Sequence, residues 1–405
     1  MLRNPVEPST VKLKRTGMDR DMPFLPEEII RNILIRLPVK SLTRFQCVCN
    51  HWKNLIKTPT FIADHLQHSR LQNPSLLLEW SGSIPLPGRL RSLDCEMQVR
   101  EVQNAPLIDS LEGACIVSSC NGLLCIEIDE CSKPPSLLLW NPATTEVRRV
   151  PRNRNDFIEF DYFVVGFGFS PIVNDYKIVT TYVEFGDEVN GVEVFSLSRG
   201  SWEGRDIGNL KGVTLDPETV TANGAIFWFG WLKLGAEGEG VVKMIVSFDI
   251  AKEVFTLIPM PDLNHDAAFE RLTFYENKLA VLCGIWEDDD KDDDDDDDDD
   301  DEISELIDLW VLDEGTCESG ERWSWNTRYA SSPFSCILYP EAIWRDEIVC
   351  QRSSLGDIEE GGCSLYLMNL TTNEVKSFVF PDYVHGIYNY VESLVSVGDN
   401  CIEES

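Results

Sequence analysis

The sequence predicts an α+β protein with two parts, a small helical domain followed by a larger all-β domain of the propeller type with about six blades. Three observations support this prediction. Apolar residues recur at helical spacing between residues 25 and 70. Beyond about residue 70, short apolar runs alternate with Gly, Asn, Asp and Pro, as in strands joined by turns. A strand-and-turn pattern also recurs along this second part at intervals of roughly 50 to 60 residues, close to the spacing of propeller blades.

Four short helices are predicted at the start of the chain. Pro26 and the two glutamates after it favour a helix N-terminus, and Pro38 ends this helix and begins the second. Thr58 and Pro59 form the cap-and-proline signal of the fourth helix. These helices carry more apolar residues, on more sides, than so small a domain can bury. That excess is typical of a docking module; an ordinary helical subdomain packed on the rest of the chain is the alternative.

The β domain is predicted from its apolar runs and from an internal repeat. The runs lie at residues 115–120, 123–128, 162–169, 176–183, 225–232, 244–250, 278–285, 306–312, 363–370 and 393–397. The repeat begins at Trp80, Trp140, Phe195, Phe248, Val311 and Met368, and the Val311 copy has a longer loop. Tyr390 to Val397 is predicted to be a strand that closes the ring with the first blade. A β-sandwich or two stacked sheets is the alternative fold.

Charge is distributed unevenly along the chain, whose formal net charge is −34. This charge argues against nucleic acid as a partner, because a phosphate backbone requires basic patches. Residues 287–302 contain fifteen acids and one lysine, and we expect them to form a disordered insertion between strands. We expect residues 1–20 to be a flexible basic arm, 21–69 the helical domain, 70–398 the β domain and 399–405 a tail.

The sequence favours a soluble intracellular protein, in the cytoplasm, the nucleus or both. We find no secretory signal and no apolar run long enough to span a membrane, so no membrane partner is expected. The thirteen cysteines follow no disulfide or metal spacing, which predicts free thiols in a reducing compartment.

No catalytic, cofactor or metal motif is recognisable, so we expect no cofactor, no bound metal and no enzymatic activity of the chain itself. His65 and His68 share a helix face and are interpreted as surface histidines. Cys115, Cys120 and Cys125 are interpreted as thiols of the core and not as metal ligands.

Residues 25–56, LPEEIIRNILIRLPVKSLTRFQCVCNHWKNLI, closely resemble the F-box. In that family the helices bind a Skp-family adaptor, which links them to a cullin–RING ubiquitin ligase. The resemblance implies that twelve residues face the adaptor or form the core of the module, without separating the two roles: Leu25, Pro26, Ile29, Ile33, Leu34, Leu37, Pro38, Leu42, Val48, Cys49, Trp52 and Leu55. Asn50 departs from the family, in which many members have lysine.

The β domain resembles the plant F-box-associated domain between roughly Leu76 and Val397. The resemblance is carried by motifs at residues 120–125 (CNGLLC), 140–144 (WNPAT), 166–169 (GFGF), 174–177 (NDYK), 223–225 (NGA) with Trp228, and 390–394 (YVESL). This domain follows the F-box in kelch-like F-box proteins of plants. The set includes pollen S-locus F-box proteins and regulators of immune-receptor turnover.

Together these resemblances imply a substrate-recognition subunit of a Skp–cullin–F-box (SCF) ubiquitin ligase. The helices would bind the adaptor, and the β domain would hold a target protein for ubiquitination and proteasomal degradation. A scaffold that binds the adaptor without directing ubiquitination is the alternative, and an enzyme with an active site on the propeller face is a third. The substrate-binding residues stay unknown at this point, although the acidic β domain predicts a basic patch on the target.

Overall fold

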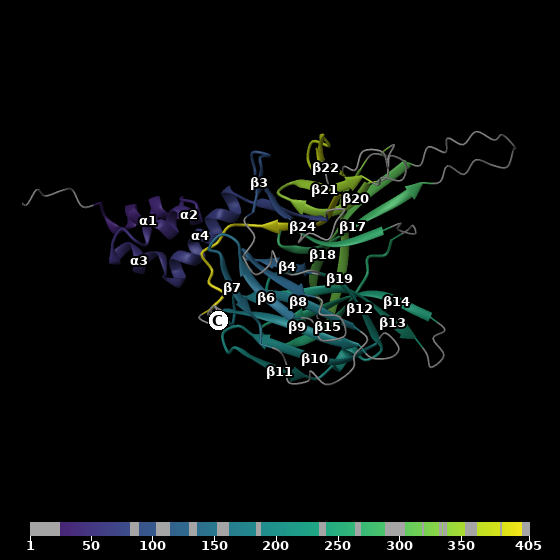
Figure 1. Ribbon diagram of the computed structural model, residues 1–405. Coiled ribbons are helices and arrows are strands. Elements are labelled where there is room, and N and C mark those ends of the chain that lie inside the picture. Colours follow the sequence, from purple (N-terminus) through teal and green to yellow (C-terminus); the bar gives the residue numbers. More distant parts are fainter. Residues whose placement is uncertain are drawn as a thin grey trace, which may run out of the picture.

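The computed structural model places four helices at one end of a six-bladed β-propeller (Figure 1). The structure describes residues 25–81, 89–102, 114–128, 136–151, 162–183, 188–234, 240–263, 269–287, 304–317, 320–331, 334, 338–352, 363–380 and 383–398. The predicted basic arm, the acidic run from residue 288 onward and the C-terminal tail lie outside the described residues. Among those that are described, no helix is long and apolar enough to cross a membrane.

All four predicted helices are present. They are α1 (Glu27–Ile35), α2 (Val39–Phe45), α3 (Asn50–Ile56) and α4 (Pro59–Gln72). Pro26 and Pro38 occupy the N-cap positions of α1 and α2, where a missing backbone N–H costs nothing. Thr58 Oγ1 accepts a hydrogen bond from Phe61 N at 3.3 Å and so caps α4, as its sequence predicts.

Each blade is a four-stranded antiparallel sheet. From the innermost strand outward, the first blade contains β24 (Tyr383–Tyr390), β1 (Ser75–Ser81), β2 (Arg89–Leu93) and β3 (Val99–Glu101). The second contains β4 (Ala114–Cys120), β5 (Leu123–Ile128), β6 (Ser136–Asn141) and β7 (Glu146–Arg149), and the third β8 (Tyr162–Ser170), β9 (Asp175–Val183), β10 (Val189–Ser196) and β11 (Ser201–Arg205).

The remaining three blades follow in chain order after a short 3-10 helix, Gly208–Leu210. The fourth contains β12 (Val213–Ala222), β13 (Ala225–Leu234), β14 (Gly240–Asp249) and β15 (Val254–Pro259). The fifth contains β16 (Phe269–Tyr275), β17 (Lys278–Glu287), β18 (Ser304–Cys317) and β19 (Gly320–Ala330), and the sixth β20 (Leu338–Trp344), β21 (Glu347–Arg352), β22 (Cys363–Asn369) and β23 (Val375–Phe380). The six innermost strands contact one another in sequence around a closed ring.

Both ends of the β domain build the first blade, because β24 pairs with β1. Ser75 lies opposite Tyr390 in this pairing. The prediction that Tyr390–Val397 is the closing strand is therefore wrong: the closing strand ends at Tyr390, and residues 391–398 are not part of any strand. The apolar alternation in this segment has another cause, because Leu394 and Val397 are buried against the helices and the second blade.

Five of the six predicted repeats begin on equivalent strands, the third of blades two to six. The copy assigned to Trp80 is not equivalent, because Trp80 lies on β1, the second strand of its blade. The offset arises because β24 supplies the inner strand of that blade from the far end of the chain. The blade number was right although this copy was misplaced by one strand.

The six inner strands all run in the same direction along the propeller axis. Their last residues, such as Ser119 of β4 and Trp344 of β20, line a chamber beside α4, which we call the proximal chamber. Earlier residues of the same strands, such as Cys115 and Glu341, line a cavity at the opposite end, which we call the distal cavity. Second strands run the other way, so the hairpin between β17 and β18, which holds the acidic run, connects strand ends on the distal face (Figure 1).

Close contact between the third and fourth blades depends on a glycine. A Cβ built on Gly166 would lie 2.3 Å from Cζ2 of Trp228 and 2.9 Å from Cγ2 of Ile226. Both neighbours are completely buried in the core shared by these blades. The glycine of the GFGF motif therefore allows two sheets to approach, which is a structural role.

Candidate functional site

An exposed apolar surface distinguishes the helical domain. Leu25, Ile29 and Ile33 lie at four-residue spacing along α1 and the residues before it, and they are 51%, 45% and 49% exposed. Val48, between α2 and α3, is 61% exposed. We call these four residues the helical apolar surface. Pro26, Pro38 and Cys49 are exposed as well. Several large apolar side chains exposed in one small domain indicate an interaction surface.

The structure places the other sequence-predicted positions in or beside the core of the helical domain. Leu34 and Leu42 are buried, with 1% and 0% exposure. Leu37, Trp52 and Leu55 are half-buried and pack against the same core. Truncating any of these five would disturb packing whether or not a partner is present, whereas the helical apolar surface can be changed without opening the core.

Helix α4 is fixed to the other helices through His65. This residue is 2% exposed, and its Nε2 lies 2.9 Å from the carbonyl oxygen of Leu37. Burial lowers the pKa of His65, in opposition to the hydrogen bond to Leu37. The interpretation of His65 as a surface histidine is therefore wrong, because one side of α4 is covered by the turn that joins α1 to α2.

The propeller completes the core of the helical domain, so the two parts form a continuous joint. Leu394, which follows the last strand, is 9% exposed and belongs to the same apolar cluster as Leu34 and Phe61. The segment 391–398 is held by Asn141 at the end of β6, whose Nδ2 donates to the carbonyl oxygens of Ser393 at 3.0 Å and Val395 at 2.7 Å. We call residues 391–398 the strap. Figure 1 shows this yellow segment between α4 and the second blade.

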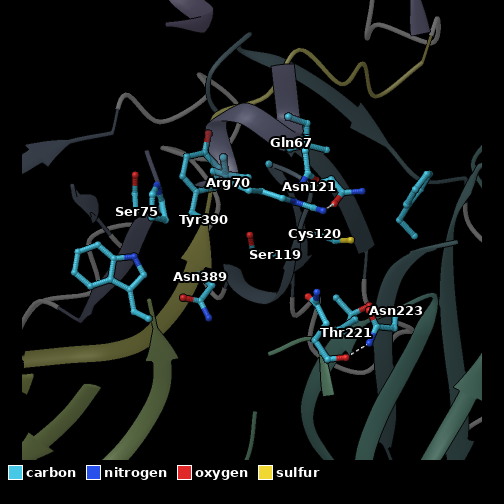
Figure 2. Close-up of a pocket in the computed structure, with 18 of the residues that line it drawn as sticks. Gln67, Arg70, Ser75, Ser119, Cys120, Asn121, Thr221, Asn223, Asn389 and Tyr390 are labelled. Atoms are coloured by element: carbon cyan, nitrogen blue, oxygen red, sulfur yellow. Dashed lines mark hydrogen bonds between the residues drawn. The ribbon is translucent and has the colours of Figure 1, made fainter. Parts of the chain in front are cut away.

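Below α4, the proximal chamber has a volume of about 650 Å³. Figure 2 shows Gln67 and Arg70 of α4 entering it from one side, with Asn121 and Asn389 among the residues around it. Arg70 donates to Oδ1 of Asn121, whose Nδ2 donates to the hydroxyl of Tyr176 at 3.0 Å. The chamber is therefore part of the joint between the two domains, and α4 forms one wall of this mouth of the propeller.

The distal cavity has a volume of about 400 Å³ and lies at the opposite mouth, away from the helices. Arg271 of β16 donates from Nη1 to Oε2 of Glu218 and from Nη2 to Oε2 of Glu341. These carboxylates come from β12 and β20, the inner strands on either side, so one guanidinium connects three blades. Burial raises the pKa of Glu341 to about 7, although Arg271 opposes this shift.

A further carboxyl group, that of Glu79, lies on the opposite wall of the distal cavity. Glu79 is 7% exposed, and its Oε2 lies 3.1 Å from the hydroxyl of Tyr388. The same hydroxyl lies 2.9 Å from the carbonyl oxygen of Ile116. Burial raises the pKa of Glu79, and the hydrogen bond from Tyr388 and the nearby His385 only partly offset the shift. This mouth of the propeller therefore combines buried acids with few cationic partners.

Other motif residues have structural roles. Lys177 of the NDYK motif is buried, donates to the carbonyl oxygen of Ile250 at 2.8 Å and pairs with Glu253, and these contacts join the third and fourth blades.

The CNGLLC motif also has a structural role. Asn121 and Gly122 form a hairpin tip with φ angles of 55° and 80°. A Cβ on Gly122 would lie 2.5 Å from the carbonyl oxygen of Val391, so this tip packs directly on the strap.

Sequence reasoning missed both the strap contacts and the distal cavity. The sequence does contain a signal for the cavity. Arg271 and Glu341 are charged residues on inner strands, and Glu79 lies on the strand next to an inner one, where most residues are apolar and few face solvent. The contact of Asn141 with the strap could not be predicted in this way, because the sequence of the WNPAT motif indicates only a turn.

Comparison with known proteins agrees with this architecture. Residues 22–63 match the F-box domain, and residues 90–397 match the F-box associated beta propeller domain. A putative F-box protein of Arabidopsis thaliana is 29% identical over 247 residues, which cover 60% of this chain and 62% of the relative. An F-box/kelch-repeat protein of the same plant is 25% identical over 58% of this chain and 65% of the relative.

A third relative, another putative F-box protein of Arabidopsis thaliana, aligns over 93% of this chain and 95% of its own length with 23% identity. The chain thus spans somewhat less than two thirds of the first two relatives and nearly all of the third. From the helical match and the propeller match together, we conclude that this chain belongs to the F-box proteins that carry an F-box-associated β-propeller domain.

Proposed function

We propose that this protein is the substrate-recognition subunit of an SCF ubiquitin ligase in the cytoplasm or nucleus. The helical domain binds a Skp-family adaptor, and the propeller binds a target protein for ubiquitination and degradation. The chain performs no covalent chemistry; it contributes proximity and orientation between the target and the ligase. One observation carries this proposal. The F-box exposes an apolar surface that a partner can cover, while its core is shared with the propeller.

The adaptor contact is assigned to the helical apolar surface. Its four side chains lie on α1 and between α2 and α3, whereas the propeller packs on α4 and on the core. A partner can therefore cover Leu25, Ile29, Ile33 and Val48 without displacing the propeller. Exposed Pro38 and Cys49 extend this surface, and Trp52 and Leu55 are half-buried in the same domain.

The target contact is assigned to the distal face of the propeller. Helix α4 forms one wall of the proximal mouth, and Arg70 of α4 donates to Asn121 there, so a target that bound in this mouth would compete with the domain joint. The distal face has a cavity of its own, and the exposed apolar residues Leu234, Val241 and Val242 lie at the end of the β13–β14 hairpin on this face. With the adaptor at one end and the target at the other, the joint fixes their relative position.

The adaptor contact can be tested by measuring the affinity of the full chain for a purified Skp-family adaptor. Ile33→Asp or Val48→Asp should weaken binding by about 30-fold or more, the cost of a central interface residue. Val379→Asp is the matched control, because Val379 is 79% exposed on the outer strand of the sixth blade. Equal affinity of wild type and Ile33→Asp would contradict the assignment. Leu37→Asp is less informative, since Leu37 is half-buried.

A further inference from the structure

We propose that the distal cavity binds a lysine or arginine side chain of the target protein, with the carboxylates of Glu341 and Glu218 as its ion-pair partners. This inference rests on the proposed function, because it names the kind of residue that the propeller recognises. The cavity, the arrangement of its hydrogen bonds and the chemistry of its wall support it independently.

The first argument is the shortage of cations among the carboxylates. Among the residues that the structure describes, Glu218 and Glu341 pair with one shared guanidinium, that of Arg271. Both contacts use Oε2, so Oε1 of each carboxylate is left to accept from a further donor. The side chain of Glu341 is 16% exposed, so an ion pair of a bound cation with Glu341 is screened less by solvent and salt than a pair in water. Glu218 is 56% exposed and adds a second, more strongly screened pair.

The second argument compares the hydrogen-bond donors and acceptors around Tyr388, on the opposite wall of the cavity. The hydroxyl of Tyr388 has one proton and two oxygen atoms within reach, Oε2 of Glu79 at 3.1 Å and the carbonyl oxygen of Ile116 at 2.9 Å. It can donate fully to only one of them. A backbone hydrogen bond from Ile116 also reaches Glu79. A carboxylate can accept several hydrogen bonds, so an ammonium or guanidinium group in the cavity could add a further N–H to Glu79.

The third argument concerns the apolar part of the wall. Phe229, Leu272 and Ile387 line the cavity together with the charged groups, and such a wall accepts the aliphatic part of a long basic side chain. Next to the cavity, Lys243 of this chain already uses the same combination. Its Nζ lies 4.3 Å from the ring centre of Phe229 and pairs with Glu270.

The binding preference can be measured with arrayed nine-residue peptides of random flanking sequence whose central residue is Lys, Arg, citrulline or norleucine. The full-length protein is used with residues 288–302 replaced by Gly and Ser, because fifteen acids in 287–302 would attract any basic peptide. We expect Lys and Arg peptides to be retained about tenfold more than citrulline and norleucine peptides, the effect of charge-assisted hydrogen bonds.

The double variant Glu218→Gln with Glu341→Gln should lose this preference, and the isosteric single variant Glu341→Gln should reduce it without a change in fold. Glu374→Gln is the control, since it removes an exposed negative charge on the sixth blade, outside the cavity. The proposal is overturned if no preference for Lys and Arg is seen, or if the preference survives in the double variant. Adaptor affinity, measured on the same preparations, reports separately on the proposed ligase function.

Discussion

Replacing Glu341 by glutamine should stabilise the propeller at alkaline pH. Glu341 has 16% of its side chain exposed, and burial raises its pKa from an ordinary 4.5 to about 7. Glutamine has nearly the same shape as the protonated side chain, so the substitution mimics the neutral state. Arg271 keeps its second partner, Glu218, in the variant. The buried negative charge is thus removed while the packing and one ion pair remain.

The sign and size of the effect follow from proton linkage. Between pH 4.5 and pH 7, the folded protein retains a proton on Glu341 that the unfolded chain has released. The contribution of this group to stability is therefore complete below pH 4.5 and is lost as the pH rises through 7. Because glutamine does not titrate, the advantage of the variant over wild type should grow by about 2 kcal/mol between roughly pH 5.5 and 8.5.

Urea unfolding followed by tryptophan fluorescence, repeated across this pH range, measures the difference. The other ionisable groups that line this cavity are present in both proteins, so their contributions largely cancel in the comparison: Glu79, Cys115, Glu127, Glu218, Arg271, His385 and Tyr388. Glu374→Gln serves as the control and should show a gap that does not change with pH. A pH-independent gap for Glu341→Gln as well would refute the reasoning, because it would mean that the carboxylate is not destabilised by burial.

Three further results are expected. Gly166→Ala should destabilise the propeller by about 1–3 kcal/mol, read from the denaturation midpoint, because its methyl group collides with a buried tryptophan; an unchanged midpoint would argue against tight blade packing there. Asn141→Ala should increase amide exchange about tenfold across residues 391–398, while the outer blades keep wild-type rates. Of the three cysteines interpreted as core thiols, Cys125 is buried but Cys115 is exposed, so the interpretation of Cys115 is wrong. Maleimide should therefore react with Cys115 in the native protein and reach Cys125 only on unfolding, because burial raises the pKa of that thiol; fast native labelling of Cys125 would contradict its burial.

Periodicity predicted the elements that depend on local patterns. The four helices and the run of strands followed from apolar spacing, prolines and turn residues, because each of these acts within a few positions of the chain. Ring closure was misplaced because the pairing of β24 with β1 joins residues about 310 positions apart, and no local signal fixes such a register. Residues 393–397 have the alternation of a strand, yet their apolar side chains pack against the helices and the second blade.

The candidate sites were predictable to different degrees. The F-box pattern placed the twelve helical positions, but only burial separates buried Leu34 and Leu42 from exposed Ile33 and Val48. Core and interface positions share the same helical period, so the sequence alone cannot distinguish them. The distal cavity is lined by residues from nine strands, including all six inner strands, which meet only in the closed ring, so no sequence motif predicted it.

The central claim is that one end of this chain engages a ubiquitin ligase. It is tested most directly by ubiquitin transfer in a ligase reconstituted from a Skp-family adaptor, a cullin, a RING protein and a ubiquitin-conjugating enzyme. The wild-type chain should acquire ubiquitin itself when all components are present, and Ile33→Asp should abolish the transfer while Val379→Asp leaves it unchanged. Adaptor binding by wild type without any ubiquitin transfer would contradict the account and indicate a scaffold.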